Sequence, residues 1–134
     1  MWYYNNVELI EVPEKMIGFV YCITNLKTGK KYIGKKNFWS TRRVKSTKRK
    51  NKKKVTNESN WREYFGSNAN LISDVETHGS DYFKREVIRL CQSKSEMSYY
   101  EIKEQIDREV IFQPENYYNN FIGCRIHGAH MRPK

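Results

Sequence analysis

Apolar residues fill two short stretches near the start of the chain, with a polar link between them. The stretches are residues 19–23 and 31–34, and the link contains Gly29. β-Branched and aromatic residues at a spacing of two are typical of strands, and a short link with glycine is typical of a hairpin. We therefore expect two antiparallel strands that turn the phenols of Tyr21 and Tyr32 toward one site.

Later in the chain the apolar positions change to a helical spacing. Leu71, Ile72 and Val75 recur at intervals of one, three and four residues. This pattern predicts a short amphipathic helix over residues 68–78, which Gly79 ends.

A third strand and a longer helix are expected next. Residues 82–91 are rich in β-forming side chains and predict a strand beside the hairpin. Ser93 and Glu96 have the spacing of a capping box, so a helix should begin there and run to about residue 111, before Pro114. Its expected buried stripe consists of Met97, Ile102, Ile106 and Val110.

The remaining segments have weaker patterns. Residues 1–17 are expected to form an edge strand or an arm on a partner, and residues 38–44 the start of a helix. Residues 48–59 are too polar to pack and are expected to be a loop. The predicted fold is therefore one α+β domain over residues 1–134, with a small three-stranded, mainly antiparallel sheet flanked by helices. A basic insertion loop is expected at about residues 43–60.

The net charge of +10 is concentrated in one part of the chain. Nine basic residues and no acidic ones lie between positions 42 and 54, so the rest of the chain carries only +1. Such a run binds a polyanion by releasing condensed counterions, although a solvated or nuclear-targeting tract has the same composition. Its position shortly after the predicted hairpin favours nucleic acid. The residues are Arg42, Arg43, Lys45, Lys48, Arg49, Lys50, Lys52, Lys53 and Lys54.

Other features exclude several protein classes. The apolar fraction is 38% and the mean hydropathy is −0.88, but 19 aromatic side chains are enough for a core. Neither a run of about 20 apolar residues nor a signal-peptide pattern is present, so we expect an intracellular protein without membrane contact. Three scattered cysteines argue against a disulfide framework. The Cys124, His127 and His130 spacing lacks a fourth zinc ligand.

The hairpin resembles the two motifs of the GIY-YIG nuclease superfamily, in its phage-type, homing-endonuclease-like branch. The first motif reads Tyr21-Cys22-Ile23-Thr24-Asn25 and the second Tyr32-Ile33-Gly34, although the usual first glycine is displaced to Gly18. Further matches are Trp61-x-x-Tyr64-x-Gly66-Ser67 and Asn119, so the resemblance covers residue 18 to about residue 120. It implies the same α+β fold and a metal-dependent DNA endonuclease.

The resemblance also implies a set of catalytic residues. An arginine about ten residues after the second tyrosine corresponds to Arg42, with Arg43 as the alternative. Its guanidinium would stabilise charge on the phosphate in the transition state. A glutamate on the late helix would hold Mg²⁺ or Mn²⁺; Glu101 is the first choice, and Glu104 one turn later stays open. The implied catalytic residues are Tyr21, Tyr32, Arg42, Glu101 and Asn119.

Which tyrosine acts as the general base stays open, with Tyr21 preferred. A phenol with a pKa near 10 is a poor base at neutral pH, so the metal together with Lys35 or Lys36 is expected to lower that pKa. The two tyrosines are alternatively a cross-strand aromatic pair that stiffens the hairpin. Ser46 and Asn68 stand where relatives have histidines, and Tyr64, Lys35 or Lys36 would take over their role.

Double-stranded DNA is the expected substrate, and the alternative is a non-catalytic nucleic-acid-binding module on the same scaffold. The protein would act in the host cytoplasm if phage-encoded, and the oligomeric state stays open, with a homodimer as one option. The expected DNA-binding residues are Lys35, Lys36, Arg43, Lys45, Lys48, Arg49, Lys50, Lys52, Lys53, Lys54, Trp61, Tyr64, Ser67 and Asn68.

Overall fold

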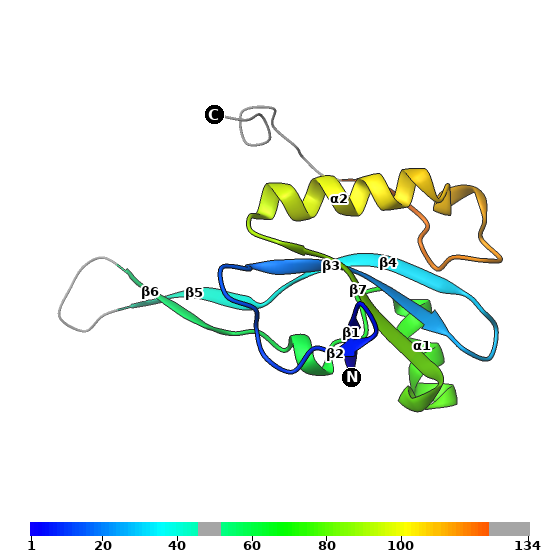
Figure 1. The fold of residues 1–134 in the computed structure, drawn as a ribbon, viewed down its shortest axis with the longest axis horizontal. Helices are drawn as coiled ribbons and strands as arrows, with labels where there is room; N and C mark the ends of the chain where they lie inside the picture. Colours follow the sequence, from blue (N-terminus) through cyan, green and yellow to red (C-terminus); the bar gives the residue numbers. More distant parts are fainter. Residues whose placement is uncertain (46–51, 124–134) are drawn as a thin grey trace.

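The computed structural model describes residues 1–45 and 52–123, without the side chains of 42–45 and 52–55. Figure 1 shows a twisted sheet with helix α2 on one face and helix α1 on the other. The strands of this sheet are, in spatial order, β2 (Val7–Glu8), β1 (Trp2–Tyr4), β7 (Phe83–Cys91), β3 (Gly18–Asn25) and β4 (Lys31–Asn37). The helices are α1 (Ala69–His78) and α2 (Lys94–Asp107), with 3-10 turns at Trp61–Glu63, Ser80–Tyr82 and Val110–Phe112.

The sheet confirms the α+β class but corrects the expected number of strands. It has five strands instead of three, and it is mixed, because β1 pairs with β7 in parallel. The hairpin β3–β4 and the antiparallel pair β3–β7 are as predicted. The two extra strands come from the N-terminal segment. Its Trp2 side chain packs in the core and is 1% exposed, which holds β1 beside β7. The expected edge strand is thus confirmed.

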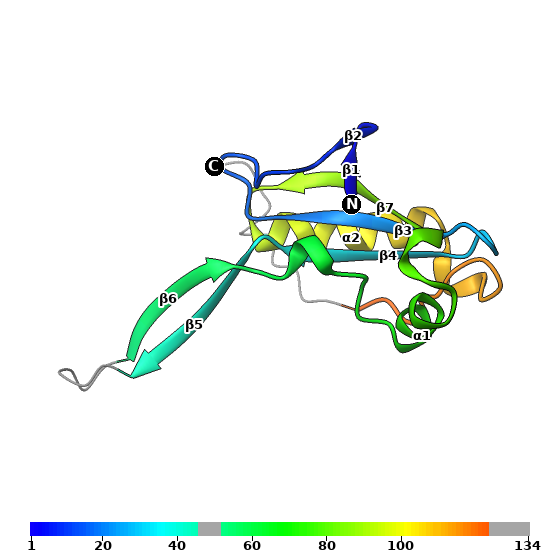
Figure 2. The same ribbon diagram turned by 90° about the horizontal axis from the view of Figure 1, so that it is seen from below.

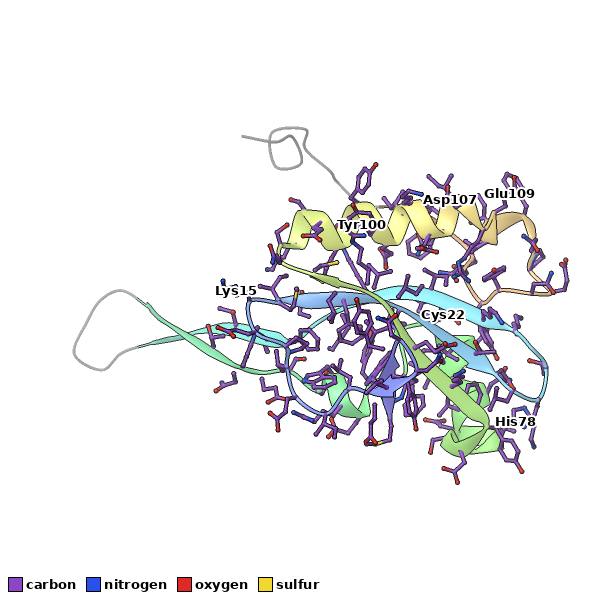
Figure 3. The ribbon with its side chains drawn as sticks, in the orientation of Figure 1. Lys15, Cys22, His78, Tyr100, Asp107 and Glu109 are labelled. Carbon is purple, nitrogen blue, oxygen red and sulfur yellow. The ribbon has the colours of Figure 1, made fainter. Side chains whose placement is uncertain are left out.

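Two hydrophobic clusters hold the layers together, and strand β3 contributes to both. Phe19, Tyr21 and Ile23 pack on the α1 face, while Val20 and Cys22 pack on the α2 face. This alternation follows from the two-residue period of a strand. Figure 3 shows side chains filling the space on either side of the sheet.

Both predicted helices form, with small differences at their ends and one in the expected buried stripe of α2, where Ile106 is 57% exposed and Gln105 is buried instead. Asn68 and Ser93 are the N-caps, and Ser93 accepts a hydrogen bond from the Glu96 amide, as expected of a capping box. Helix α2 ends at Asp107 rather than at about residue 111, because Glu109 adopts a left-handed conformation with φ 53°. In the described part of the chain no helix is long and apolar enough to cross a membrane.

The basic segment forms a second, two-stranded sheet, which corrects both the helix predicted over 38–44 and the loop predicted over 48–59. Strands β5 (Trp39–Lys45) and β6 (Lys52–Glu58) pair antiparallel, from Trp39 opposite Glu58 to Lys45 opposite Lys52. Figure 2 shows this basic ribbon extending away from the main sheet. Lys48, Arg49 and Lys50 lie outside the described residues.

Candidate active site

Strand β4 is the last strand on one side of the main sheet. Residues outside the sheet bind its outward-facing backbone groups, one after another along the strand. The Lys31 amide donates to the Asn116 carbonyl at 2.9 Å, and the Tyr118 amide donates to the Lys31 carbonyl at 2.8 Å. A sheet edge carries unpaired amides and carbonyls that need partners. Residues 116–119 therefore run along the first part of the edge.

Asn119 and Gln105 bind the next outward-facing backbone groups. The Asn119 side chain accepts from the Ile33 amide at 3.0 Å and donates to the Ile33 carbonyl at 2.8 Å. Gln105 of α2 donates to the same carbonyl at 3.1 Å. Both side chains are buried, so they fix the Tyr-Ile-Gly motif against α2. This clamp occupies both polar atoms of Asn119, the residue expected to be catalytic.

Glu101 of α2 binds the β4 backbone at Lys35, two residues after Ile33. The backbone amide of Lys35 hydrogen-bonds to its carboxylate, and the Lys35 ammonium is nearby. Burial nevertheless raises the pKa of Glu101, although both Lys35 interactions act in the opposite direction. The alternative, Glu104, forms an ion pair with Arg108 at 2.9 Å. The two glutamates thus have different surroundings, and only Glu101 of the two lines the cavity described below.

Tyr21 and Tyr32 lie on the same face of the hairpin, as the alternation predicts. Tyr21 pairs with Gly34 and Tyr32 pairs with Ile23, so the two phenols are diagonal neighbours with ring centroids 6.1 Å apart. Tyr21 is 1% exposed, whereas Tyr32 is half-buried and its hydroxyl lies 3.3 Å from the Ser67 hydroxyl. Only the second phenol is therefore open to a ligand.

The pKa of each tyrosine is raised in the protein by itself, without the metal that is expected to lower it together with Lys35 or Lys36. Burial raises the pKa of Tyr21 well above 10, and Tyr64 and Tyr32 raise it further. Burial also raises the pKa of Tyr32, partly offset by the Ser67 hydrogen bond. Both phenols are thus protonated at neutral pH in the protein by itself.

Tyr64 completes the aromatic group and is held by a buried arginine. Its ring stands nearly perpendicular to that of Tyr21, at 84°, with centroids 6.0 Å apart, and the two hydroxyls are hydrogen-bonded. Arg85 of β7 donates to the carbonyls of Tyr64 and Arg62 at 2.8 and 3.0 Å. Burial lowers the pKa of Arg85 to about 10. Sequence reasoning missed this residue because an arginine within a strand gives no signal of burial.

A cavity of about 410 Å³ opens at this edge, between α2 and the start of α1. Tyr32 and Glu101 reach it from opposite faces of the sheet, which is possible because β4 is the last strand. The lining residues are Tyr32, Ser67, Asn68, Ala69, Glu101, Gln105, Asn119, Asn120, Phe121 and Gly123. The cavity thus combines one phenol, one carboxylate and several amides.

The single carboxylate that the structure describes at this cavity fits a divalent cation that takes its remaining ligands from water and phosphate. Among the described residues, no three His, Cys, Asp or Glu side chains converge on one point, so Glu101 would be the only carboxylate to hold a cation in this cavity. Mg²⁺ is often held by one or two carboxylates and completes its shell with water and substrate phosphates. A cation would also compensate the charge of Glu101, which burial disfavours.

Several residues expected to contact DNA have structural positions instead. Trp61 is 1% exposed, and its indole donates to Glu58 at 2.8 Å, so it cannot stack on a base. The side-chain oxygen of Asn68 accepts hydrogen bonds from the first backbone amides of α1 and so caps the helix. The side-chain NH₂ group of Asn68 donates to the Tyr118 carbonyl. Lys35 donates to Ser98 of α2 at 2.8 Å.

The structure does not bring Arg42 to the Tyr32–Glu101 cavity. Its backbone lies opposite Val55 in the basic ribbon, and Figure 2 shows that this ribbon extends away from the main sheet. Arg43 lies one residue further out, opposite Lys54. Counting ten residues from Tyr32 assumed a helix after β4, but a strand follows there.

Gly34 allows the Tyr21 ring to lie across β4, which leads to a prediction. A Cβ atom on Gly34 would lie 2.6 Å from Cζ of Tyr21 and closer still to its hydroxyl. We expect Gly34→Ala to displace this ring and to destabilise the fold by about 1–3 kcal/mol, the usual range for overpacking. Urea denaturation measures the change. The loss should shrink in a Tyr21→Phe background, which removes the closest atom, and an equal loss in both backgrounds would contradict this explanation.

Comparison with known protein families finds a family whose model matches most of the chain. A family model described as "Putative endonuclease segE, GIY-YIG domain" matches residues 2–122. The chain therefore belongs to this GIY-YIG endonuclease family, and the resemblance noted in the sequence is confirmed. Membership implies an endonuclease, a hydrolase that acts on DNA. No curated protein and no solved structure matches the chain.

Proposed function

We propose that the protein is a divalent-metal-dependent endodeoxyribonuclease, of phage or mobile-element type, that hydrolyses phosphodiester bonds of double-stranded DNA. The observation that carries this proposal is that Tyr32 and Glu101 line the same cavity at the β4 edge. A phosphodiester would enter through this cavity, because Tyr32 and Glu101 both line it.

Glu101 is the proposed ligand for Mg²⁺ or Mn²⁺. When bound there, the cation would supply Lewis-acid stabilisation of the charge on the scissile phosphate. The Lys35 amide holds the carboxylate in place, and Lys35 itself is fixed by Ser98. Glu101 is therefore held in position before substrate binds, which is what a metal ligand requires.

Tyr32 is the proposed proton-transfer residue. Because burial raises its pKa, its phenol carries a proton at neutral pH and can donate that proton to the leaving oxygen. This general-acid role differs from the general-base role that the sequence left open between the two tyrosines, with Tyr21 preferred. Tyr21 supports Tyr32 by packing, since its hydroxyl is buried against Gly34 and Tyr64. Asn119 and Gln105 act as positioning residues through Ile33.

The basic ribbon is the proposed grip on the DNA backbone, and Arg42 and Arg43 belong to it. Two pairs of basic residues stand directly opposite each other, Arg43 with Lys54 and Lys45 with Lys52. Like charges in such cross-strand pairs are destabilising, and a polyanion relieves the repulsion. A two-stranded ribbon is also narrow enough for the major groove of duplex DNA.

We predict that neutralising one face of this ribbon weakens DNA binding without changing turnover. A variant with glutamine at Arg43, Lys45, Lys52 and Lys54 should lose affinity for unrelated duplexes alike. The slope of log K against log salt should fall by about one unit per lost phosphate contact. Anisotropy titrations with labelled duplexes at several salt concentrations measure both quantities.

A matched variant controls for net charge. Glutamine at the exposed residues Lys15, Lys27, Lys84 and Lys103 removes the same four charges elsewhere on the surface. This control should keep most of the affinity and of the salt slope. Equal losses in the two variants would show that only overall charge matters and would refute a specific grip by the ribbon.

Cleavage of supercoiled plasmid tests the proposed function. The protein should convert it to nicked or linear DNA with Mg²⁺ or Mn²⁺ and should be inactive with excess chelator. The buried Tyr21 and the position of Arg42 on the ribbon favour the second candidate, a non-catalytic module that binds DNA on the same scaffold. Tight binding without cleavage at any metal concentration would support that candidate and refute the nuclease.

A further inference from the structure

Two adjoining cavities lie further along the same edge, between the tyrosines and the basic ribbon. The smaller has a volume of about 300 Å³ and reaches Tyr64, and the larger has about 780 Å³ and reaches the base of the ribbon. They share Lys36 and Asn37 at the end of β4 and Lys94 at the start of α2. Lysines from two separate elements thus converge on one space outside the Tyr32–Glu101 cavity.

The positive charge of this space is not neutralised by the protein. Among the described residues, neither Lys36 nor Lys94 has a carboxylate within ion-pair distance. Glu58 also lines the larger cavity, but it accepts hydrogen bonds from Trp61 and Arg62, both at 2.8 Å. In the described part of the chain, the site therefore presents two cations that lack an ion-pair partner, and the carboxylate that also lines it, Glu58, is paired with Arg62.

Lys36 is held in this position before any ligand binds. Its ammonium lies 4.2 Å from the centroid of the Tyr64 ring, and burial lowers its pKa. A cation over an aromatic face is attracted to the ring, so the contact orders a side chain that would otherwise be mobile. Partial loss of hydration strengthens its interaction with an anion.

Asn37 adds a polar group that the protein leaves incomplete. Its side-chain oxygen is buried and has no hydrogen-bond partner among the described residues. A buried polar atom without a partner is unfavourable. A phosphate oxygen is also an acceptor, so this atom does not bind the anion, and the two lysines carry the recognition.

We propose that Lys36 and Lys94 bind a backbone phosphate of the substrate strand on the ribbon side of the cleavage point. The inference rests on the proposed function, because it assigns the direction in which the substrate strand leaves the cavity. A strand advances about 3.3 Å per residue, so Lys36 is about 13 Å along β4 from Tyr32. The bound phosphate is therefore within a few linkages of the scissile one.

Duplexes with one neutral methylphosphonate linkage test this pairing. Each linkage of one strand of a short duplex is replaced in turn, and binding is measured with Ca²⁺ in place of Mg²⁺. In the wild-type protein, replacing one linkage should weaken binding by about two- to fivefold, the size of a partly exposed ion pair, and where the duplex is cut this linkage should lie on one side of the cut. In Lys94→Met and Lys36→Met, replacing that same linkage should cause no further loss.

Two further variants make the outcome decisive. Lys94→Arg keeps the charge and should keep the penalty at that linkage, which excludes a folding defect as the cause. Lys103→Met removes an exposed charge from the same helix and should behave as wild type. An equal penalty in wild type, Lys94→Met and Lys36→Met at every linkage would overturn the proposal. Because the assay measures binding alone, a protein that binds in this pattern but never cuts would refute the nuclease and leave the phosphate site intact.

Discussion

Glu101→Gln is expected to lower the rate of DNA cleavage by at least about a thousandfold, since metal coordination contributes several kcal/mol to the transition state. Glutamine keeps an oxygen that can accept the Lys35 amide hydrogen bond but removes the negative charge that holds the cation. DNA binding without metal should stay within a few-fold of wild type. Single-turnover cleavage of a labelled duplex with Mg²⁺ measures the rate.

Glu104→Gln is the matched control, because this residue lies one turn away and is paired with Arg108. It should cleave at nearly the wild-type rate. A Glu101→Gln protein with normal turnover, or a Glu104→Gln protein without activity, would contradict the assignment of the metal ligand.

Glu101→Gln should also leave the protein at least as stable as wild type. Burial raises the pKa of Glu101 in the folded state above its unfolded value, so at neutral pH the charged form is disfavoured by folding. This destabilisation disappears as the pH falls through the raised pKa. Thermal unfolding should therefore show a stability gain in the variant near pH 7 that shrinks in acid, as expected where a functional group opposes stability.

Tyr32→Phe is expected to slow cleavage by about 10²- to 10⁴-fold, the range that positioned proton transfer contributes. Tyr21→Phe should cost much less, because the Tyr21 hydroxyl is buried and contacts Tyr64 instead of the cavity. Both variants keep the aromatic ring, so the fold should persist. Single-turnover rates with saturating protein separate this effect from binding.

The reverse order of the two tyrosine variants would refute the role of Tyr32. If Tyr21→Phe were the more damaging change, the buried hydroxyl would have to become accessible during the reaction. Small and equal losses would reduce both tyrosines to a packing pair.

The sequence predicts those elements that depend on neighbouring residues. The β3–β4 hairpin, the helix after Asn68 and the capping box at Ser93 are local features, and all three are present. The parallel pairing of β1 with β7 joins residues about eighty positions apart, and no local pattern indicates it. The sequence does not predict the strands of the basic ribbon, because polar residues, many of them lysines and arginines, occupy most positions and leave no alternation of apolar and polar residues.

The candidate site is predictable to a similar extent. Tyr32 and Glu101 follow from the motifs, and the structure adds that they meet around an edge strand. Gln105 could have been suspected, since it lies four residues after Glu101 on one helix face. Nothing in the sequence indicates that Asn119 binds the Ile33 backbone or that Arg85 holds Tyr64, because both contacts depend on the tertiary fold.

A double-mutant cycle on the single-turnover cleavage rate tests most directly whether Tyr32 and Glu101 act in one catalytic site. Wild type, Tyr32→Phe, Glu101→Gln and the double variant are compared on one duplex with Mg²⁺. Residues that act as a unit are strongly non-additive, so the double variant should be about as slow as the slower single variant. If the two losses multiplied, the residues would act independently, and the claim of a shared site at the β4 edge would be wrong.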